Sequence, residues 1–289
     1  MSIKLNYLNK SSSKISSNLV LFCDEKYSTS GLKKHLSNNE FSYISDLIKT
    51  ADLKKNLFVF EVSSKKKIIL VSIKKNLNSA EIENLGAEFF KKVNYGNNSE
   101  YYLISDSVTK KNGNFLGHFL HGLKLKSYEF KKYKTKKDTR IISMNVVGNR
   151  NIPSAQNQLK FKALEEGTFF ARDLVSEPGN ILHPDEYAKR ISLLKKDGLK
   201  INIYDEKKLK KLGMHALLGV GQGSIRGSYL VTMEWNGAKN NSKPLAFVGK
   251  GVCFDTGGYS LKPAKFMEDM TYDMAGSATV VGLMKNFAL

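Results

Sequence analysis

The feature that most constrains the fold is an alternation of short apolar runs with amphipathic stretches over residues 1–150. Asn78 and Glu81 form a predicted capping pair for a helix that carries Ile82 and Phe89 on one face and ends near Gly96. A second helix is predicted over 115–125. The runs rich in β-branched and aromatic residues, which predict strands, are 19–23, 57–62, 68–73, 101–104 and 141–147. Residues 57–73 can pair as a hairpin, and the whole predicts an α/β domain.

Residues 151–289 continue the alternation with longer helices. Apolar residues from Leu159 to Leu174 keep helical spacing, which predicts a connecting helix that ends at Pro178-Gly179. A second helix is predicted from Pro184 to Gly198. Strands are then predicted at 201–204, 229–235 and 245–248, with a short helix at 206–212. Such alternation is typical of a parallel or mixed sheet with helices on both faces. We therefore expect three parts, namely 1–150, 151–178 and 179–289.

Composition limits the function classes. No apolar run approaches the roughly 18 residues that a membrane span needs, the N-terminus lacks the apolar core of a secretory signal, and Cys23 and Cys253 have no metal-ligand spacing. These features predict a cytoplasmic protein. The net charge is +19, but only five of the 46 basic residues are arginine, and lysine runs such as 131–137 are typical of solvated surfaces. Nucleic-acid binding is therefore the minority prediction.

Two other motifs predict ordinary structure. His118 and His121 lie three apart on a helix but lack a third ligand, which is more typical of a helix face than of a metal site. The glycine-rich stretch 219–224 has Ser224 where a dinucleotide-binding loop needs glycine, and a strand rather than a helix follows it. We interpret that stretch as a sharp turn.

The chemistry is concentrated in residues 248–282. A predicted strand ends in Gly-Lys-Gly at 249–251, and sites in α/β sheets lie beyond such strand ends. Asp255 follows, then two glycines, then Lys262 before a proline, and Asp273 stands just before a helix that begins near Gly276. Each residue alone is typical of an ordinary surface loop. The whole set, with glycines on both sides of Asp255, favours a functional site.

The order of the residues in this stretch resembles the signature of a known family. Residues 249–263 read Gly-Lys-Gly-Val-Cys-Phe-Asp-Thr-Gly-Gly-Tyr-Ser-Leu-Lys-Pro, and Asp-Met-Ala-Gly follows at 273–276. This string resembles the signature of the leucine aminopeptidase (cytosol aminopeptidase) family, with unbroken spacing between the functional positions. Residues 172–180 and 219–226 also resemble segments of that family's catalytic domain. The resemblance covers about 160–289, whereas 1–150 match only as an α/β domain of the expected size.

The resemblance implies specific roles. Lys250, Asp255 and Asp273 would bind metal, Lys262 would stabilise the oxyanion, and Met270 would line the pocket for the substrate's N-terminal side chain, although a methionine filling a core gap is an equal alternative. Two divalent ions, Mn²⁺ or Zn²⁺, are implied, and paired ions need bridging carboxylates. A lysine ligand must be neutral, so the metal must lower its pKa well below about 10.4.

The implied activity is removal of N-terminal residues, leucine preferred, from peptides by a homohexameric enzyme. The implied fold is a small N-terminal α/β domain, a connecting helix and the first part of a larger α/β metallopeptidase domain with a central mixed sheet. Tyr259, Tyr272 and Ser277 stand where the family has small apolar residues. These departures concern the shape of the pocket rather than its ligands.

One family motif does not occur in the sequence. The family carries a downstream Asp-Ala-Glu-Gly-Arg string that supplies two more carboxylate ligands and the arginine that holds bicarbonate. We therefore expect a C-terminally truncated fragment, whose last apolar helix has no cap. Two alternatives stay open: a non-catalytic chain that binds at most one metal ion weakly, and a DNA-binding protein.

Overall fold

The computed structural model describes residues 2–8, 15, 17–94, 99–108, 114–136, 138–238 and 243–289. The chain divides into two compact units, Met1–Phe161 and Lys162–Leu289. The strands are β1 (Ser2–Leu8), β2 (Asn18–Asp24), β3 (Leu57–Ser63), β4 (Lys66–Ile73), β5 (Glu100–Ile104), β6 (Ile141–Val147), β7 (Lys200–Tyr204) and β8 (Leu230–Glu234). The α-helices are α1 (Asn38–Lys49), α2 (Ser79–Val93), α3 (Phe115–Ser127), α4 (Ala155–Ser176), α5 (Pro184–Ser192), α6 (Glu206–Lys211), α7 (His215–Gly221), α8 (Ala264–Met267) and α9 (Ala275–Ala288).

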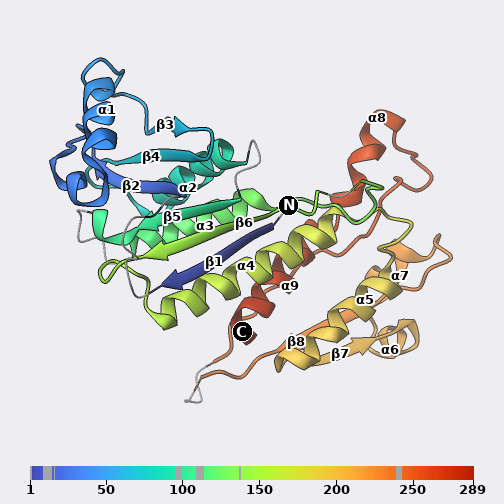
Figure 1. Ribbon diagram of the computed structural model, residues 1–289. Coiled ribbons are helices and arrows are strands. Elements are labelled where there is room, and N and C mark those ends of the chain that lie inside the picture. The colour runs from blue at the N-terminus through green and yellow to red at the C-terminus, as the bar shows by residue number, and fades with distance from the viewer. Residues whose placement is uncertain are drawn as a thin grey trace. The chain divides into compact units, whose positions relative to one another are not determined.

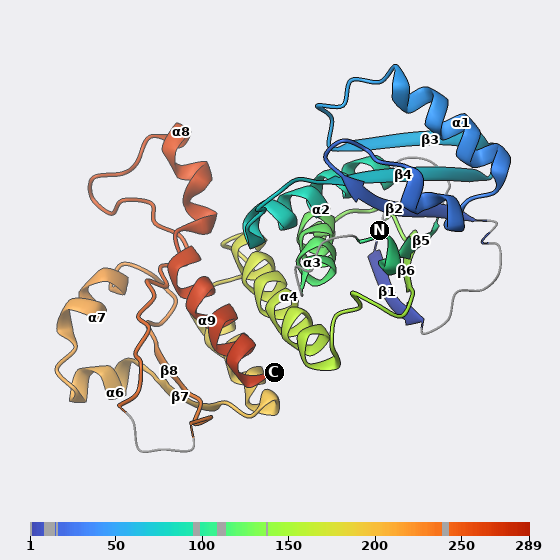
Figure 2. The same ribbon diagram turned by 90° about the vertical axis from the view of Figure 1, so that its left-hand side faces the viewer.

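The first unit is built on a six-stranded sheet in the order β1-β6-β5-β2-β4-β3. β3 runs antiparallel to β4, whereas the other pairs are parallel, so the sheet is mixed. Helices α2 and α3 lie on one face and α1 lies on the other (Figures 1 and 2). The strands contribute side chains to two cores, one on each face of the sheet, because successive side chains of a strand point to opposite faces. Val20 and Phe22 belong to the core under α2 and α3, and Leu19 and Leu21 to the core under α1.

Two glycines let α2 and α3 pack closer than any side chain would allow. A Cβ added at Gly86 would lie 1.9 Å from the carbonyl oxygen of Phe119, and one added at Gly122 would lie 1.9 Å from that of Glu83. Both obstacles are backbone atoms, which cannot rotate away. The direct contact of the two helix backbones therefore depends on these glycines.

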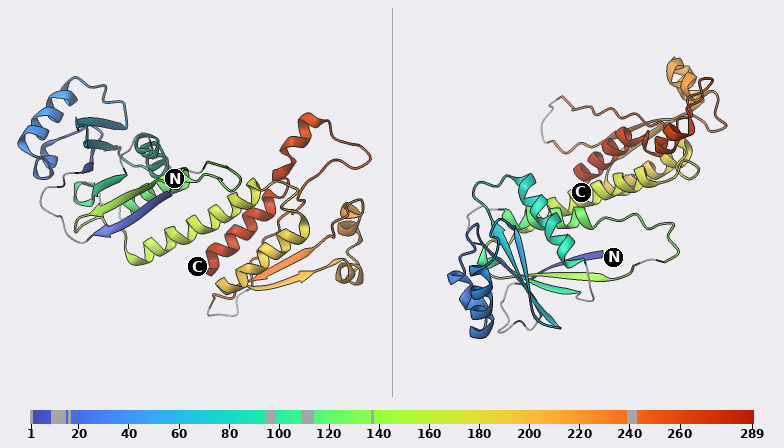
Figure 3. Two further views of the ribbon diagram at one scale, coloured as in Figure 1. Left: turned by 45° about the vertical axis from the view of Figure 1, so that its right-hand side comes forward. Right: turned by 90° about the horizontal axis from the view of Figure 1, so that it is seen from above.

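The second unit is layered in a different way. The part of α4 within this unit lies beside α9, and α5 lies between α9 and the antiparallel pair β7–β8 (Figure 3). Gly167 and Gly282 form another close crossing, since a Cβ on Gly282 would lie 2.6 Å from the carbonyl oxygen of Gly167. The core of this unit includes Leu174, Tyr187, Ile191, Met274 and Val281.

Most of the predicted elements are confirmed, together with the α/β class. Asn78 and Glu81 form a capping box at α2, as predicted. That helix ends at Val93, and Gly96, its predicted end, lies outside the described residues. Sequence analysis missed β1, α1, α7 and α8. The predicted turn at 219–224 is confirmed only in its second half, because residues 219–221 are the end of α7 and the turn begins at Gln222.

The predicted strand at 245–248 is wrong. These residues form no ladder, and Leu245 and Val248 are 86% and 95% exposed. An apolar β-prone run becomes a strand only when a neighbour takes up its backbone hydrogen bonds. Within the described part of the second unit, the strands that pair are β7 and β8.

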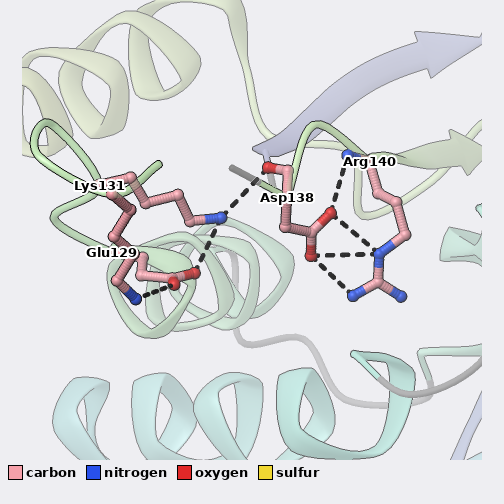
Figure 4. Close-up of polar contacts among 5 residues, drawn as sticks. Glu129, Lys131, Asp138 and Arg140 are labelled. Carbon is pink, nitrogen blue, oxygen red and sulfur yellow. Dashed lines mark hydrogen bonds and ion pairs between the residues drawn. The ribbon is translucent and has the colours of Figure 1, made fainter. Parts of the chain in front are cut away.

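The lysine run at 131–137 shows how the positive charge is balanced locally; residue 137 itself lies outside the described part. Lys131 Nζ lies 2.9 Å from Glu129 Oε2 and donates to the Asp138 carbonyl oxygen at 3.2 Å (Figure 4). Arg140 donates through Nη2 to Asp138 Oδ2 at 2.8 Å, and this hydrogen bond holds the pKa of Asp138 well below its usual value. Acidic side chains of the same segment thus neutralise part of the run.

No helix of the described part is both long and apolar enough to cross a membrane.

The α2–α3 contact gives a first prediction. Gly122→Ala should destabilise the first unit by about 1–3 kcal/mol, because the new methyl group meets a backbone carbonyl and forces the helices apart. The measurement is urea unfolding followed by circular dichroism. Gly31→Ala is the matched control, since a Cβ there meets nothing within 4 Å. Equal midpoints for the two variants would contradict the packing argument.

Candidate active site

The candidate site is formed by the loop that begins at Gly249 and by the segment that leads into α9. Lys250 Nζ makes an ion pair with the Asp273 carboxylate and also donates to the Asp273 carbonyl oxygen at 3.1 Å. The Lys250 side chain is largely exposed, whereas that of Asp273 is mostly buried. Asp273 Oδ2 is a buried atom that accepts no hydrogen bond from the described residues.

A second pair of opposite charges lies in the same loop. Lys262 Nζ lies 3.0 Å from Asp255 Oδ2, and the Gly257 backbone amide donates to Asp255 Oδ1 at 2.8 Å. The Gly257 amide, then Lys262, then the nearby charge of Lys250 hold the pKa of Asp255 below its usual value. Asp255 is therefore ionised at neutral pH, and Lys250 lies close enough to act on both aspartates.

The shape of the loop explains why glycines follow Asp255. Gly257 and Gly258 have φ of +98° and +77°, which side-chain-bearing residues rarely adopt. A Cβ at Gly257 would also lie 2.3 Å from the Ser260 carbonyl oxygen. The Lys262 amide donates to the Thr256 carbonyl oxygen at 2.9 Å and closes the loop. This closure returns the Lys262 ammonium to Asp255.

Met270 lies at the same place. Its sulfur is 3.2 Å from Lys262 Nζ, and its side chain is half-buried. A thioether is a weak acceptor, so it holds the ammonium without neutralising it. Of the positions that depart from the family pattern, Tyr259 is fully exposed at the loop tip and Tyr272 is about half exposed.

A backbone clamp joins the loop to α9. The Ser277 amide donates to the Lys250 carbonyl oxygen at 3.0 Å. A Cβ at Gly249 would lie 2.4 Å from Ser277 Cα, so only glycine lets the two segments come this close. Lys250 and Asp273 are brought together by this contact.

Tyr187 supports the clamp, and sequence reasoning missed it. Its hydroxyl lies 2.9 Å from Ser277 Oγ, which lies 2.8 Å from the Met274 carbonyl oxygen. Tyr187 is buried on α5, and burial raises the pKa of its hydroxyl above the usual value. The only sequence signal was the departure at Ser277, and nothing pointed to a partner ninety residues away.

An ion pair supports the segment before the loop. Arg190 Nη1 lies 2.7 Å from Oε1 of the buried Glu177, and its Nε lies 2.9 Å from Glu186 Oε1. The pair holds the end of α4 next to α5. Gly179 follows, and a Cβ there would lie 3.0 Å from the ring of Phe254. Phe254, directly before Asp255, is thereby packed against a fixed turn.

The donor set fits a divalent cation in part. Lys250, Asp255 and Asp273 offer one amine and two carboxylates, and carboxylate oxygens suit divalent ions. The buried, unpartnered Asp273 Oδ2 is the kind of atom that a bound cation would satisfy. In the described ranges no three His, Cys, Asp or Glu side chains gather. The residues present therefore supply part of the donor set that a divalent cation needs.

Comparison with known proteins gives a family for this region. Residues 169–289 match the sequence profile of the cytosol aminopeptidase family, catalytic domain. Residues 169–289 belong to the cytosol aminopeptidase family. A probable cytosol aminopeptidase of Bradyrhizobium sp. is 49% identical over 171 residues, which cover 58% of this chain and 34% of the relative. One from Nitrobacter winogradskyi is 37% identical over 298 residues, covering 93% of this chain and 57% of the relative.

Solved structures show the same fold. A mutant of tomato leucine aminopeptidase superposes with a TM-score of 0.77 at 20% identity, covering 99% of this chain and 59% of that one. The bottromycin maturation enzyme BotP in complex with Mn superposes with a TM-score of 0.72 at 22% identity, covering 95% and 56%. The chain thus spans between a third and three fifths of the length of these cytosol aminopeptidase relatives and structural neighbours.

The Tyr187–Ser277 hydrogen bond can be tested by substitution. Ser277→Ala should lower the free energy of unfolding by about 1–3 kcal/mol, because it leaves the buried Tyr187 hydroxyl unpaired. Adding Tyr187→Phe should recover part of that loss. A double-mutant cycle from urea unfolding measures the coupling. Strictly additive effects of the two substitutions would show that the bond contributes nothing.

Proposed function

We propose that this chain carries part of the active centre of a metal-dependent aminopeptidase that acts on peptides. The observation that supports the proposal is the pair of lysine–aspartate contacts, Lys250 with Asp273 and Lys262 with Asp255, in a loop that matches the family signature. These contacts join two segments at the positions where the family resemblance implies metal and oxyanion binding.

Each residue has a distinct role in this proposal. Lys250, Asp255 and Asp273 would hold the cation, which would polarise the scissile carbonyl and activate water. Lys250 would bind the cation as a neutral amine. Asp255 and the Met270 sulfur hold the Lys262 ammonium in place. A fixed ammonium beside the carbonyl stabilises the negative charge that develops on its oxygen.

The finer properties are also proposals. Met270 borders Lys262 and would face the substrate's first side chain, with leucine preferred. Mn²⁺ or Zn²⁺ would serve as the two ions, and the BotP structure in complex with Mn supports the first. We further propose a homohexamer in the cytoplasm and a division into 1–150, 151–178 and 179–289, in which the first part serves assembly or regulation.

A second candidate follows from the donor count. Asp255 and Asp273 supply two carboxylates, fewer than two bridged ions need, and the described residues add no third to them. In this alternative the 289-residue chain binds one cation weakly and does not hydrolyse peptides.

One experiment separates the two candidates. The purified chain is incubated with Mn²⁺ and a chromogenic leucyl amide, beside Lys262→Ala and Lys265→Ala variants. Lys265 is the control because it lies on α8 and takes no part in the two lysine–aspartate pairs. Its ammonium lies 5.8 Å from the Phe266 ring centroid. Active-site hydrolysis should fall by about 10²–10³-fold in Lys262→Ala and stay unchanged in Lys265→Ala.

The outcomes have distinct meanings. Activity that only Lys262→Ala abolishes supports the aminopeptidase. If a folded chain binds Mn²⁺ but hydrolyses nothing, the one-cation alternative is supported. If an added segment with the Asp-Ala-Glu-Gly-Arg motif then restores hydrolysis, the aminopeptidase proposal is supported. No Mn²⁺ binding and no rescue would overturn both.

A further inference from the structure

A second cluster of reactive side chains lies in the first unit, outside the candidate active site. His118 on α3 stands between two residues of α2. Its Nδ1 lies 2.8 Å from Glu83 Oε1, and its Nε2 lies 3.2 Å from Ser79 Oγ. Serine, imidazole and carboxylate are thus joined in one line. This is the order of contacts in a serine nucleophile, its general base and the group that orients the base.

The contacts also set the proton positions. A carboxylate only accepts hydrogen bonds, so the neutral imidazole places its proton on Nδ1, toward Glu83. Nε2 then presents a lone pair to the Ser79 hydroxyl. The Ser79 side chain is exposed, whereas those of His118 and Glu83 are 23% and 30% exposed. The nucleophile is therefore accessible while the base and its carboxylate are partly shielded.

The packing of α3 against α2 fixes the positions of these three side chains. Glu83 and Ser79 are on one helix, and the glycine contact between Gly122 and the Glu83 carbonyl oxygen holds α3 against it. The Phe161 ring meets the His118 ring edge-on, with centroids 5.0 Å apart. Side chains on packed helices are held more accurately than side chains on loops.

The position of Ser79 adds donors for a developing oxyanion. Ser79 is the first residue of α2, directly after the cap residue Asn78. The capping box engages the amides of Asn78 and Glu81, and the Ile82 amide donates to the Asn78 carbonyl oxygen. The first amides of a helix point outward and favour negative charge. Those of Ser79 and Ala80 are next to the nucleophile.

From this geometry we propose that Ser79, His118 and Glu83 form an acyl-transfer centre that takes small carboxylic esters. Ser79 Oγ attacks the ester carbonyl carbon as its proton passes to His118 Nε2. The carbon–oxygen bond to the alcohol then breaks, and the leaving alkoxide takes that proton from Nε2. Water hydrolyses the acyl-serine by the same route, so ester and water give acid and alcohol.

The test is covalent labelling of the full chain with a fluorophosphonate, an activated-serine reagent, followed by mass spectrometry of the peptides. EDTA is present throughout, so that the candidate metal site makes no contribution and the result is independent of the proposed aminopeptidase. Ser79 should be labelled, and p-nitrophenyl acetate should be hydrolysed above the rate in buffer. Ser79→Ala should remove both signals.

Variants of the base complete the test. His118→Gln should slow labelling about 10²–10⁴-fold, and Glu83→Gln should slow it too, since the amide no longer fixes the tautomer. Ser192→Ala is the matched control, because the Ser192 hydroxyl donates to a backbone carbonyl at 2.6 Å. Circular dichroism confirms folding, and Ser79→Ala, an exposed substitution, suffices if His118→Gln unfolds. Labelling of Ser79 no faster than that of Ser192, or unchanged in Glu83→Gln, overturns the proposal.

Discussion

The candidate active site depends on one backbone contact, the hydrogen bond from the Ser277 amide to the Lys250 carbonyl oxygen. Glycine at position 249 makes this hydrogen bond possible, since any side chain there would collide with Ser277 Cα. The contact fixes the start of α9 against the loop, and Asp273 stands just before that helix. Without it, Lys250 and Asp273 would lie on two independent segments, and the loop would hold only the Asp255–Lys262 pair. The Tyr187 hydroxyl supports the contact from α5.

What the sequence could predict was local. Strands β2 to β6 of the first unit follow from buried apolar runs, and the start of α2 follows from a cap that uses side chains three residues apart. The candidate site residues could be named because they lie in one short stretch with glycines at fixed places. The positive φ of Gly257 and Gly258 agrees with that interpretation. Such features need no knowledge of distant parts of the chain.

What the sequence could not predict depends on pairing over long distances. Residues 245–248 have the composition of a strand, but strand formation requires a partner, and these residues have no ladder in the described structure. Neither Tyr187 nor Ser277 indicates the other in the sequence, and their hydrogen bond exists because α5 and α9 lie in one core. The line from Ser79 to His118 and Glu83 likewise spans two helices that only tertiary packing brings together.

Glycines within helices explain much of the difference between what the sequence could predict and what it could not. By propensity it is a weak point, since it costs about 1 kcal/mol relative to alanine. Gly86 and Gly122 instead mark where α2 meets α3, and Gly167 and Gly282 mark where α4 meets α9. At each crossing a carbonyl oxygen occupies the space of the missing side chain. The local cost is offset by backbone contact between the paired helices, so these four glycines are sites of packing rather than of flexibility.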